Sequence, residues 1–187
     1  MTAPTLARYD VLDVSDAVAV AAYEEAFYRG FVRVTTNRLI RDLWRWDHDA
    51  RRLAARIPYD EQTVFLERDA SGAIETAMAT NVAMRAWQAS AFGFGDGIDT
   101  TGCCELLTFF TAGDHRLEQK LRFVHACFSD LRSRGFHTAY ATTAARPLPS
   151  YIHIGGELLA EREIQGEMRY LLRFSLERAW MRRRPMR

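Results

Sequence analysis

The stretch from Cys103 to Gly156 constrains the fold more than any other part of the chain. Apolar residues dominate 103–111 and indicate a buried strand. From 117 to 134 the apolar residues form one stripe at helical spacing, and Gly135 follows as a natural C-terminal residue of that helix. A second strand over 137–143 and a short helix that begins at Ser150 complete the stretch. Strands that alternate with helices in this way are typical of an α/β domain.

The N-terminal part of the chain adds one strand and two helices to this prediction. Alternating residues indicate a short strand over Tyr9–Val14, and residues 15–16 offer an N-cap for a helix over Ala17–Phe31. A strongly periodic apolar stripe then predicts a second, long helix from Leu39 to Ile57, which Pro58 ends.

Two hairpins complete the set of expected elements. They are strands 63–67 and 73–82 around a turn at 69–72, and strands 158–164 and 167–176 around a turn at 165–166. We therefore expect a mixed, mostly antiparallel central sheet flanked by helices. One domain would cover residues 1–187, with a basic tail from about residue 178.

The composition argues against several functional classes. The net charge of +1 leaves no strong field for nucleic acid or an anionic membrane. No apolar run is long enough to span a bilayer, and the N-terminus lacks the pattern of a signal peptide. The three cysteines, Cys103, Cys104 and Cys127, do not form a disulfide framework. We therefore expect a cytoplasmic protein.

The succession of elements resembles the GNAT superfamily of N-acyltransferases along nearly the full chain. Many of these enzymes carry a tyrosine four residues before a glycine in the helix after the fifth strand, and Tyr151 and Gly155 keep that spacing. The resemblance implies that Tyr151 lies near the thioester sulfur and protonates the departing thiolate. A phenol with a pKa near ~10 holds its proton at neutral pH and can serve in this way. The alternative is an aromatic residue that only packs against the sheet.

Glu105 is the candidate general base, because several members of the superfamily place such a base on the strand before the long helix. An amine must lose a proton before or during its attack on a thioester, and a carboxylate in a partly dry cleft can accept that proton directly or through a water. Glu75, on the preceding strand, is the competing candidate. Main-chain N–H groups of the same strand would polarise the thioester carbonyl.

The phosphate-binding loop departs from the pattern of the superfamily. Its usual glycines, whose bare amides hold the diphosphate of coenzyme A, are replaced by Gln119 and Leu121, although Arg116 is present and Gly113 lies nearby. Either Gly113 supplies the close approach, or the donor is an acyl carrier protein, whose 4′-phosphopantetheine arm carries one phosphate. The donor contacts that we expect are Phe110, Thr111, Gly113, Arg116, Lys120 and Ser150.

The second explanation places the chain near the branch that uses acyl-carrier-protein thioesters. That branch contains the acyl-homoserine-lactone synthases and the long-chain N-acyl amino acid synthases, although the chain lacks the strongly marked N-terminal residues of the lactone synthases. The expected reaction is direct attack of an amine acceptor on acyl-CoA or on the acyl-carrier-protein thioester. It needs no metal and forms no covalent enzyme intermediate. The acceptor is a small molecule, an amino acid or a peptide, and family habit suggests a homodimer.

Other classes remain as alternatives. A catalytically inactive GNAT-like module would bind a ligand or partner without chemistry, and the lost glycines favour it. A cysteine hydrolase would pair Cys103 or Cys104 with His115 or His137, but no helix N-terminus stands behind these thiols to stabilise a thiolate. Nucleic-acid binding rests only on the arginines of 38–56, and an exposed helix face with aspartate partners explains these arginines better.

Overall fold

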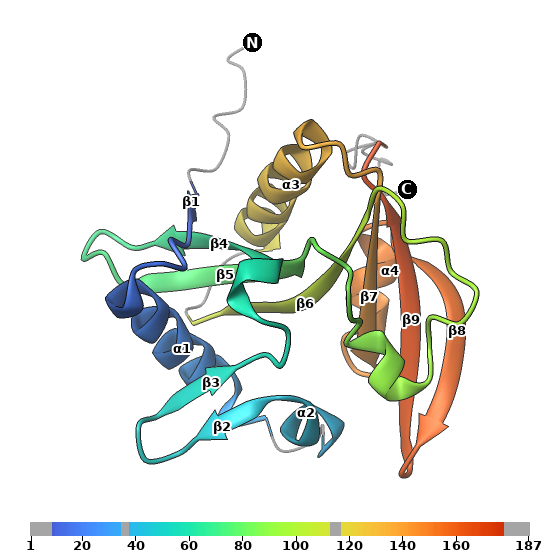
Figure 1. The fold of residues 1–187 in the computed structure, drawn as a ribbon, viewed down its shortest axis with the longest axis horizontal. Helices are drawn as coiled ribbons and strands as arrows, with labels where there is room; N and C mark the ends of the chain where they lie inside the picture. The colour runs from blue at the N-terminus through green and yellow to red at the C-terminus, as the bar shows by residue number, and fades with distance from the viewer. Residues whose placement is uncertain (1–8, 35–37, 113–116, 178–187) are drawn as a thin grey trace.

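The computed structural model describes residues 9–34, 38–112 and 117–177. Seven strands form one sheet in the order β1-β4-β5-β6-β7-β9-β8, and two short strands form a separate hairpin (Figure 1). The strands of the large sheet are β1 (Asp10–Val11), β4 (Gln62–Arg68), β5 (Ile74–Asn81), β6 (Cys103–Thr111), β7 (Thr138–Ala144), β8 (Glu157–Ile164) and β9 (Glu167–Ser175). Neighbouring strands are antiparallel except for the parallel pair β6–β7, so the predicted mixed, mostly antiparallel sheet is confirmed.

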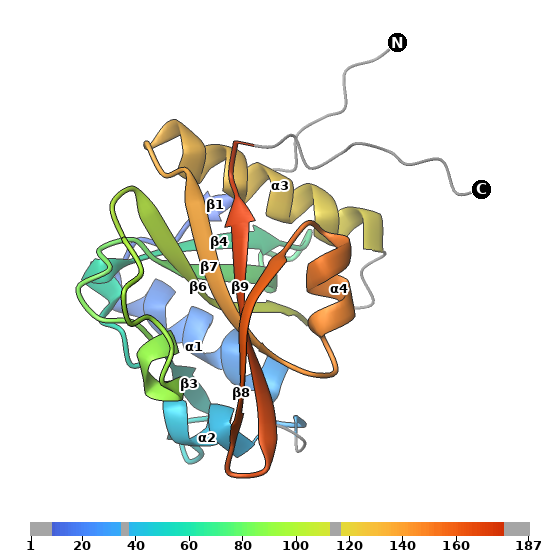
Figure 2. The same ribbon diagram turned by 90° about the vertical axis from the view of Figure 1, so that its right-hand side faces the viewer.

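Helices cover both faces of the sheet. The helices are α1 (Ala17–Phe31), α2 (Arg38–Leu43), α3 (Leu117–Ser133) and α4 (Leu148–His153), with short 3-10 turns η1 (Tyr59–Glu61) and η2 (Ala89–Phe92). Figure 1 shows α3 on one face and α1 on the other, and Figure 2 shows α4 beside β7 and β9 on the side of α3. The start of α1 is confirmed, because the Asp16 carboxylate accepts hydrogen bonds from the main-chain N–H groups of Val18 and Ala19 at 2.8 and 3.2 Å.

The two faces bury separate apolar clusters. The cluster under α1 includes Phe27, Trp44 and Phe110, whereas the cluster under α3 includes Phe123 and Phe174. The sheet separates these two cores along most of its length.

The prediction of one long helix over Leu39–Ile57 is wrong. Only α2 is helical there, and the chain then forms the hairpin of β2 (Arg45–Asp47) and β3 (Arg52–Ala54). The Asp47 carboxylate accepts a hydrogen bond from the main-chain N–H of Ala50 at 2.8 Å, and Arg51 adopts a left-handed φ of 56°. Both features stabilise a turn at the expense of a helix. The arginines of this segment therefore do not form one helix face.

The parallel pair β6–β7 is short, and the two strands separate beyond it. Their register runs only from Cys103 opposite Thr138 to Leu106 opposite Ala141, although β6 continues to Thr111 and β7 to Ala144. The two strands therefore separate beyond Leu106 and Ala141, and this separation divides the sheet into two antiparallel halves that join along a short seam.

Candidate functional site

A cavity of about 670 Å³ lies where β6 and β7 separate. Its lining is mostly apolar and comes from both sides of the sheet. From the side of α3 it includes Leu117, Lys120, Leu121, Val124, Phe128, Ser150, Tyr151, His153 and Ile154; from the side of α1 it includes Phe31, Leu43, Trp44, Gln88, Phe92 and Arg169. The cavity therefore connects the two faces through the gap between the strands.

Tyr151 lies on α4 and lines this cavity, as does its neighbour Ser150. The Tyr151 ring is 6.2 Å from the ring of Phe174, and burial raises the pKa of its phenol above the ordinary value of 10.0. The phenol is therefore protonated at neutral pH, as an acid that protonates a thiolate must be.

The end of α4 is built around a close approach of the backbone at Gly156. The main-chain N–H of Gly156 donates to the Tyr151 carbonyl at 2.9 Å, and a Cβ at residue 156 would lie 2.8 Å from that oxygen and 2.8 Å from the Phe174 ring. Gly155, the glycine of the predicted spacing, has a φ of 93°, a conformation that favours glycine. Both glycines thus let the chain turn directly behind Tyr151.

Glu105 lies on β6 but does not line the cavity. Its side chain is fully buried, and its two carboxylate oxygens accept hydrogen bonds from the main-chain N–H groups of Gln88 and Ala89 at 2.8 and 2.7 Å. Burial raises the pKa of this carboxyl to about 7, and the hydrogen bonds from Gln88, Ala89 and Asn81 oppose the shift. In this arrangement Glu105 fixes the start of η2. Glu75, the competing candidate, also lies outside the lining.

Gln88, a residue that no sequence pattern singled out, links Glu105 to the cavity. Its main chain is held by Glu105, whereas its side chain lines the cavity, accepts a hydrogen bond from the Trp44 indole at 3.0 Å and donates one to the Leu107 carbonyl at 3.3 Å. Leu107 falls where the register of β5 and β6 shifts, because Ala79 faces Thr108 and Thr80 faces Leu106. The strand is thus irregular where it borders the cavity.

The predicted donor contacts divide into three groups. Lys120 and Ser150 line the cavity together with Tyr151. Phe110 is instead buried in the core under α1, where its ring stacks on Phe27 at 5.6 Å, and Thr111 lies at the end of β6 outside the lining. Gly113 and Arg116 lie outside the described residues.

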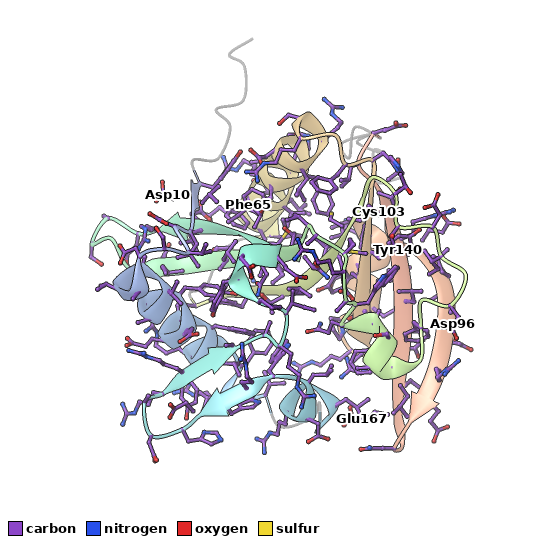
Figure 3. All side chains as sticks on the ribbon, viewed as in Figure 1. Asp10, Phe65, Asp96, Cys103, Tyr140 and Glu167 are labelled. Atoms are coloured by element: carbon purple, nitrogen blue, oxygen red, sulfur yellow. The ribbon has the colours of Figure 1, made fainter. Side chains whose placement is uncertain are left out.

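Arg169 is a lining residue that the sequence did not single out. It lies on β9, is only 2% exposed, and places its guanidinium 4.8 Å from the centroid of the Phe92 ring. Glu167, at the same end of β9, is 3.9 Å from one of its nitrogens (Figure 3). Burial lowers the pKa of this arginine below its ordinary value.

The cysteines lie apart from this site. Cys103 and Cys104 are buried and do not line the cavity, and burial raises the pKa of the Cys104 thiol to about 12. Among the described residues no group of three or more His, Cys, Asp or Glu side chains could hold a metal ion, and no helix is long and apolar enough to cross a membrane.

Comparisons of sequence leave the chain without a match, both to protein-family models and to curated proteins. Comparisons with solved structures, in contrast, find proteins of the same fold. The fold is similar to that of TofI, solved with an inhibitor and MTA, at a TM-score of 0.68 and 16% identity over 90% of this chain and 91% of that chain. BjaI, a CoA-dependent acyl-homoserine lactone synthase solved with SAM and isopentyl-CoA, gives 0.66 and 12% over 85% and 78%.

An acetyltransferase shares the same architecture. The ribosomal-protein-S18-alanine N-acetyltransferase from Escherichia coli gives a TM-score of 0.56 at 9% identity, over 92% of this chain and 96% of that chain. The chain therefore has the GNAT fold, which acyl-homoserine lactone synthases and N-acetyltransferases share, and the resemblance seen in the sequence is confirmed at the level of the fold.

Proposed function

We propose that the protein is an N-acyltransferase that moves an acyl group from a thioester to an amine by direct attack. The observation that carries this proposal is the cavity at the β6–β7 separation, which Tyr151, Ser150 and Lys120 line together. A pantetheine arm is slender and carries amide groups, so it suits a gap between two strands that no longer pair with each other there. Lys120, at the start of α3, would attract a phosphate of the donor.

Tyr151 is the proposed general acid. The amine nitrogen attacks the thioester carbonyl, a C–N bond forms, the C–S bond breaks, and the phenol protonates the departing thiolate. Main-chain N–H groups of β6 near Leu107 would stabilise the oxyanion, since the strand leaves its regular register there. The proton that the amine loses passes to the base, and the phenolate then regains a proton from solvent.

Glu105 is the proposed base, and water would carry the proton to it, because the carboxylate does not line the cavity. Its pKa of about 7 lets it exchange a proton near neutral pH. Its contacts also assign it a positioning role, since it holds the main chain of Gln88 and thereby the wall of the cavity.

The donor is either acyl-CoA or an acyl carrier protein. BjaI is described as CoA-dependent, whereas Gln119 and Leu121 replace the usual glycines of the diphosphate loop here. The test is thiol release by the purified protein from matched acyl-CoA and acyl-carrier-protein donors, of short and long chain, with a broad panel of primary amines. Release from the carrier protein alone would indicate the carrier-protein branch, and release from CoA would show that the altered loop binds a diphosphate.

The runner-up is a ligand- or partner-binding module without chemistry. It would be favoured if no donor released thiol with any amine, or if Tyr151→Phe and Glu105→Ala both left turnover unchanged. Either result would contradict the proposed acyl transfer or its assigned residues.

A further inference from the structure

The side chain of Gln88 binds a main-chain carbonyl at the irregular point of β6. Gln88 lines the cavity, and its Nε2 donates to the carbonyl oxygen of Leu107 at 3.3 Å. In the described sheet Leu107 has no register partner on either neighbouring strand. The pairing with β5 passes from Leu106 to Thr108, and the pairing with β7 ends at Leu106. Gln88 therefore supplies a hydrogen bond where the strand ladder offers Leu107 no partner residue.

The orientation of the Gln88 amide follows from its two partners. The indole Nε1 of Trp44 can only donate, and it donates to the Gln88 Oε1 at 3.0 Å. The Nε2 end is thereby directed to the Leu107 carbonyl, which can only accept. An amide turned by half a rotation would lose both hydrogen bonds. Trp44 is itself held in place, since its ring lies 4.8 Å from the rings of both Phe27 and Phe31.

The main chain at Gln88 is fixed as well, because Glu105 accepts hydrogen bonds from the N–H groups of Gln88 and Ala89 at 2.8 and 2.7 Å. A side chain at this position must both accept from an indole and donate to a carbonyl. An ionised glutamate cannot donate, an apolar side chain does neither, and asparagine is one carbon shorter. The position therefore suits glutamine better than any other residue.

The direction of the Leu107 carbonyl bears on the proposed chemistry. When the amine attacks, the carbonyl oxygen of the thioester gains negative charge, and main-chain N–H groups of β6 near Leu107 are its proposed donors. A peptide carbonyl turned towards that oxygen would repel it, because its own oxygen carries partial negative charge. The bond from Gln88 fixes where the Leu107 oxygen points and offsets part of its charge.

We propose that Gln88 is a positioning residue for acyl transfer. It holds the Leu107 carbonyl away from the developing oxyanion, so that N–H groups of β6 face the oxyanion instead. This inference rests on the proposed acyl transfer and adds no covalent step to it. Because the effect is felt only when charge develops on the thioester oxygen, Gln88 contributes to kcat and not to the binding of either substrate.

The kinetic test uses Gln88→Met, which keeps the length of the side chain and removes both hydrogen bonds. The kcat for thiol release, with the amine that the wild type uses best, should fall about 30- to 100-fold. The KM values for donor and acceptor should stay within about threefold. An unchanged kcat, or a rise in KM that accounts for the whole loss of kcat/KM, would overturn the inference and leave acyl transfer intact.

Gln62→Met is the matched control. Gln62 is buried, donates through its Nε2 to the Ile57 carbonyl at 2.6 Å, and does not line the cavity. The variant loses the same kind of hydrogen bond, so it should lower the midpoint of thermal unfolding while kcat stays within about twofold of the wild type. Equal losses of kcat in Gln62→Met and Gln88→Met would show a general effect of stability and overturn the positioning role.

A double-mutant cycle tests whether Trp44 acts through Gln88. Trp44→Phe removes the indole N–H that orients the amide, and kcat should fall about tenfold. In Gln88→Met the same substitution should lower kcat no further, because the amide that it orients is already gone. Losses that multiply in the double variant would contradict a shared action on the Leu107 carbonyl.

Infrared spectroscopy of a bound ketone separates this inference from the proposed function. An acyl-pantetheine analogue with CH₂ in place of the thioester sulfur keeps the carbonyl and cannot release thiol. Hydrogen bonds from N–H groups lower the stretching frequency of that carbonyl. The band should therefore shift down on binding to the wild type and to Gln62→Met, and shift less on binding to Gln88→Met.

The outcomes of the two assays are distinct. A shift that depends on Gln88, in a protein that releases no thiol with any amine, would support the positioning of β6 and contradict acyl transfer. Thiol release by a protein in which the shift is the same with and without Gln88 would overturn this inference alone.

Discussion

Single residues set the protonation states on which the proposed chemistry depends. Tyr151 and Glu105 are both partly or fully removed from water, and in both cases burial favours the neutral form. For the phenol this keeps a proton available for transfer. For the carboxyl it brings the pKa to about 7, where a small change in pH changes its charge.

Replacement of Tyr151 by phenylalanine should lower kcat by about 100-fold, because the thiolate then leaves without a proton donor. The KM for the donor should change little, since the ring still fills its place beside Phe174. Steady-state thiol release measures both values. Tyr140→Phe is the control, because Tyr140 is buried against Trp87 but does not line the cavity. Equal kcat values for wild type and Tyr151→Phe would remove the acid role.

Glu105 should make the stability of the protein depend on pH. The buried carboxyl has a pKa of about 7, against a reference value of 4.5, so between these values the folded state holds a proton that the unfolded state has lost. The free energy of unfolding should therefore fall as the pH rises from 4.5 to 7, by roughly 3 kcal/mol. Urea titrations at several pH values would measure the slope. In Glu105→Gln this slope should be absent, and an unchanged slope would contradict the shifted pKa.

The sequence identifies some of these residues and misses others for a physical reason. Tyr151 is recognisable because its spacing from Gly155 reflects a local turn. Arg169 and Gln88 reach the cavity only because β9 and the start of η2 fold against β6 and β7. The spacing of residues along the chain does not reveal such a contact between distant segments. Glu105 is visible as a carboxylate on the right strand, but its burial and its bonds to Gln88 and Ala89 depend on a distant loop.

At the scale of elements, α3 brings its first turns to the edge of the cavity. Lys120 lines the cavity, whereas Arg122, two residues further on, is exposed and does not. Neighbouring positions on a helix point in different directions, so these two cations provide a matched pair.

Lys120→Ala should raise the KM for the donor about tenfold, the effect of losing roughly 1.4 kcal/mol of attraction to a phosphate. Arg122→Ala should leave that KM unchanged with acyl-CoA. If Arg122→Ala weakened only the carrier-protein donor, the result would indicate that this helix docks the carrier protein. Equal KM values for wild type and Lys120→Ala would exclude Lys120 from donor binding.

The elements themselves are predictable where a segment has one dominant pattern. The start of α1, both hairpins of the large sheet and the course of β6, α3 and β7 follow from periodicity and caps. The region of β2 and β3 does not, because apolar residues spaced for a helix can also be buried by a hairpin packed on α1. The hydrogen bond from the Ala50 N–H to the Asp47 carboxylate favours the hairpin over the helix. The periodicity of apolar residues contains no information about this bond.

At the scale of the whole molecule, the order of elements is sufficient to predict the mixed sheet and the GNAT fold. The large cavity was not visible in the sequence, because it arises from the mutual arrangement of elements far apart in the chain, from α1 to β9.

Occupation of this cavity should stabilise the entire fold. A thioether analogue of an acyl-pantetheine, at about 100 times its Kd, would add about 2.7 kcal/mol to the free energy of unfolding. For a chain of this size the midpoint of thermal unfolding should rise by about 5–10 °C. Differential scanning calorimetry measures the shift, and acetate at the same concentration is the control. No shift at saturation, judged by calorimetric titration, would contradict binding to the folded state at this site.

The seam between β6 and β7 has a further consequence for what can enter the protein. Past Leu106 and Ala141 the two strands no longer pair with each other, and an unprotected strand edge is a template on which foreign strands can aggregate. Here the two edges face each other across the cavity of about 670 Å³, between α3 on one side and η2 on the other. This position shields the edges from foreign strands and leaves room for a slender molecule whose amide groups can form hydrogen bonds with them.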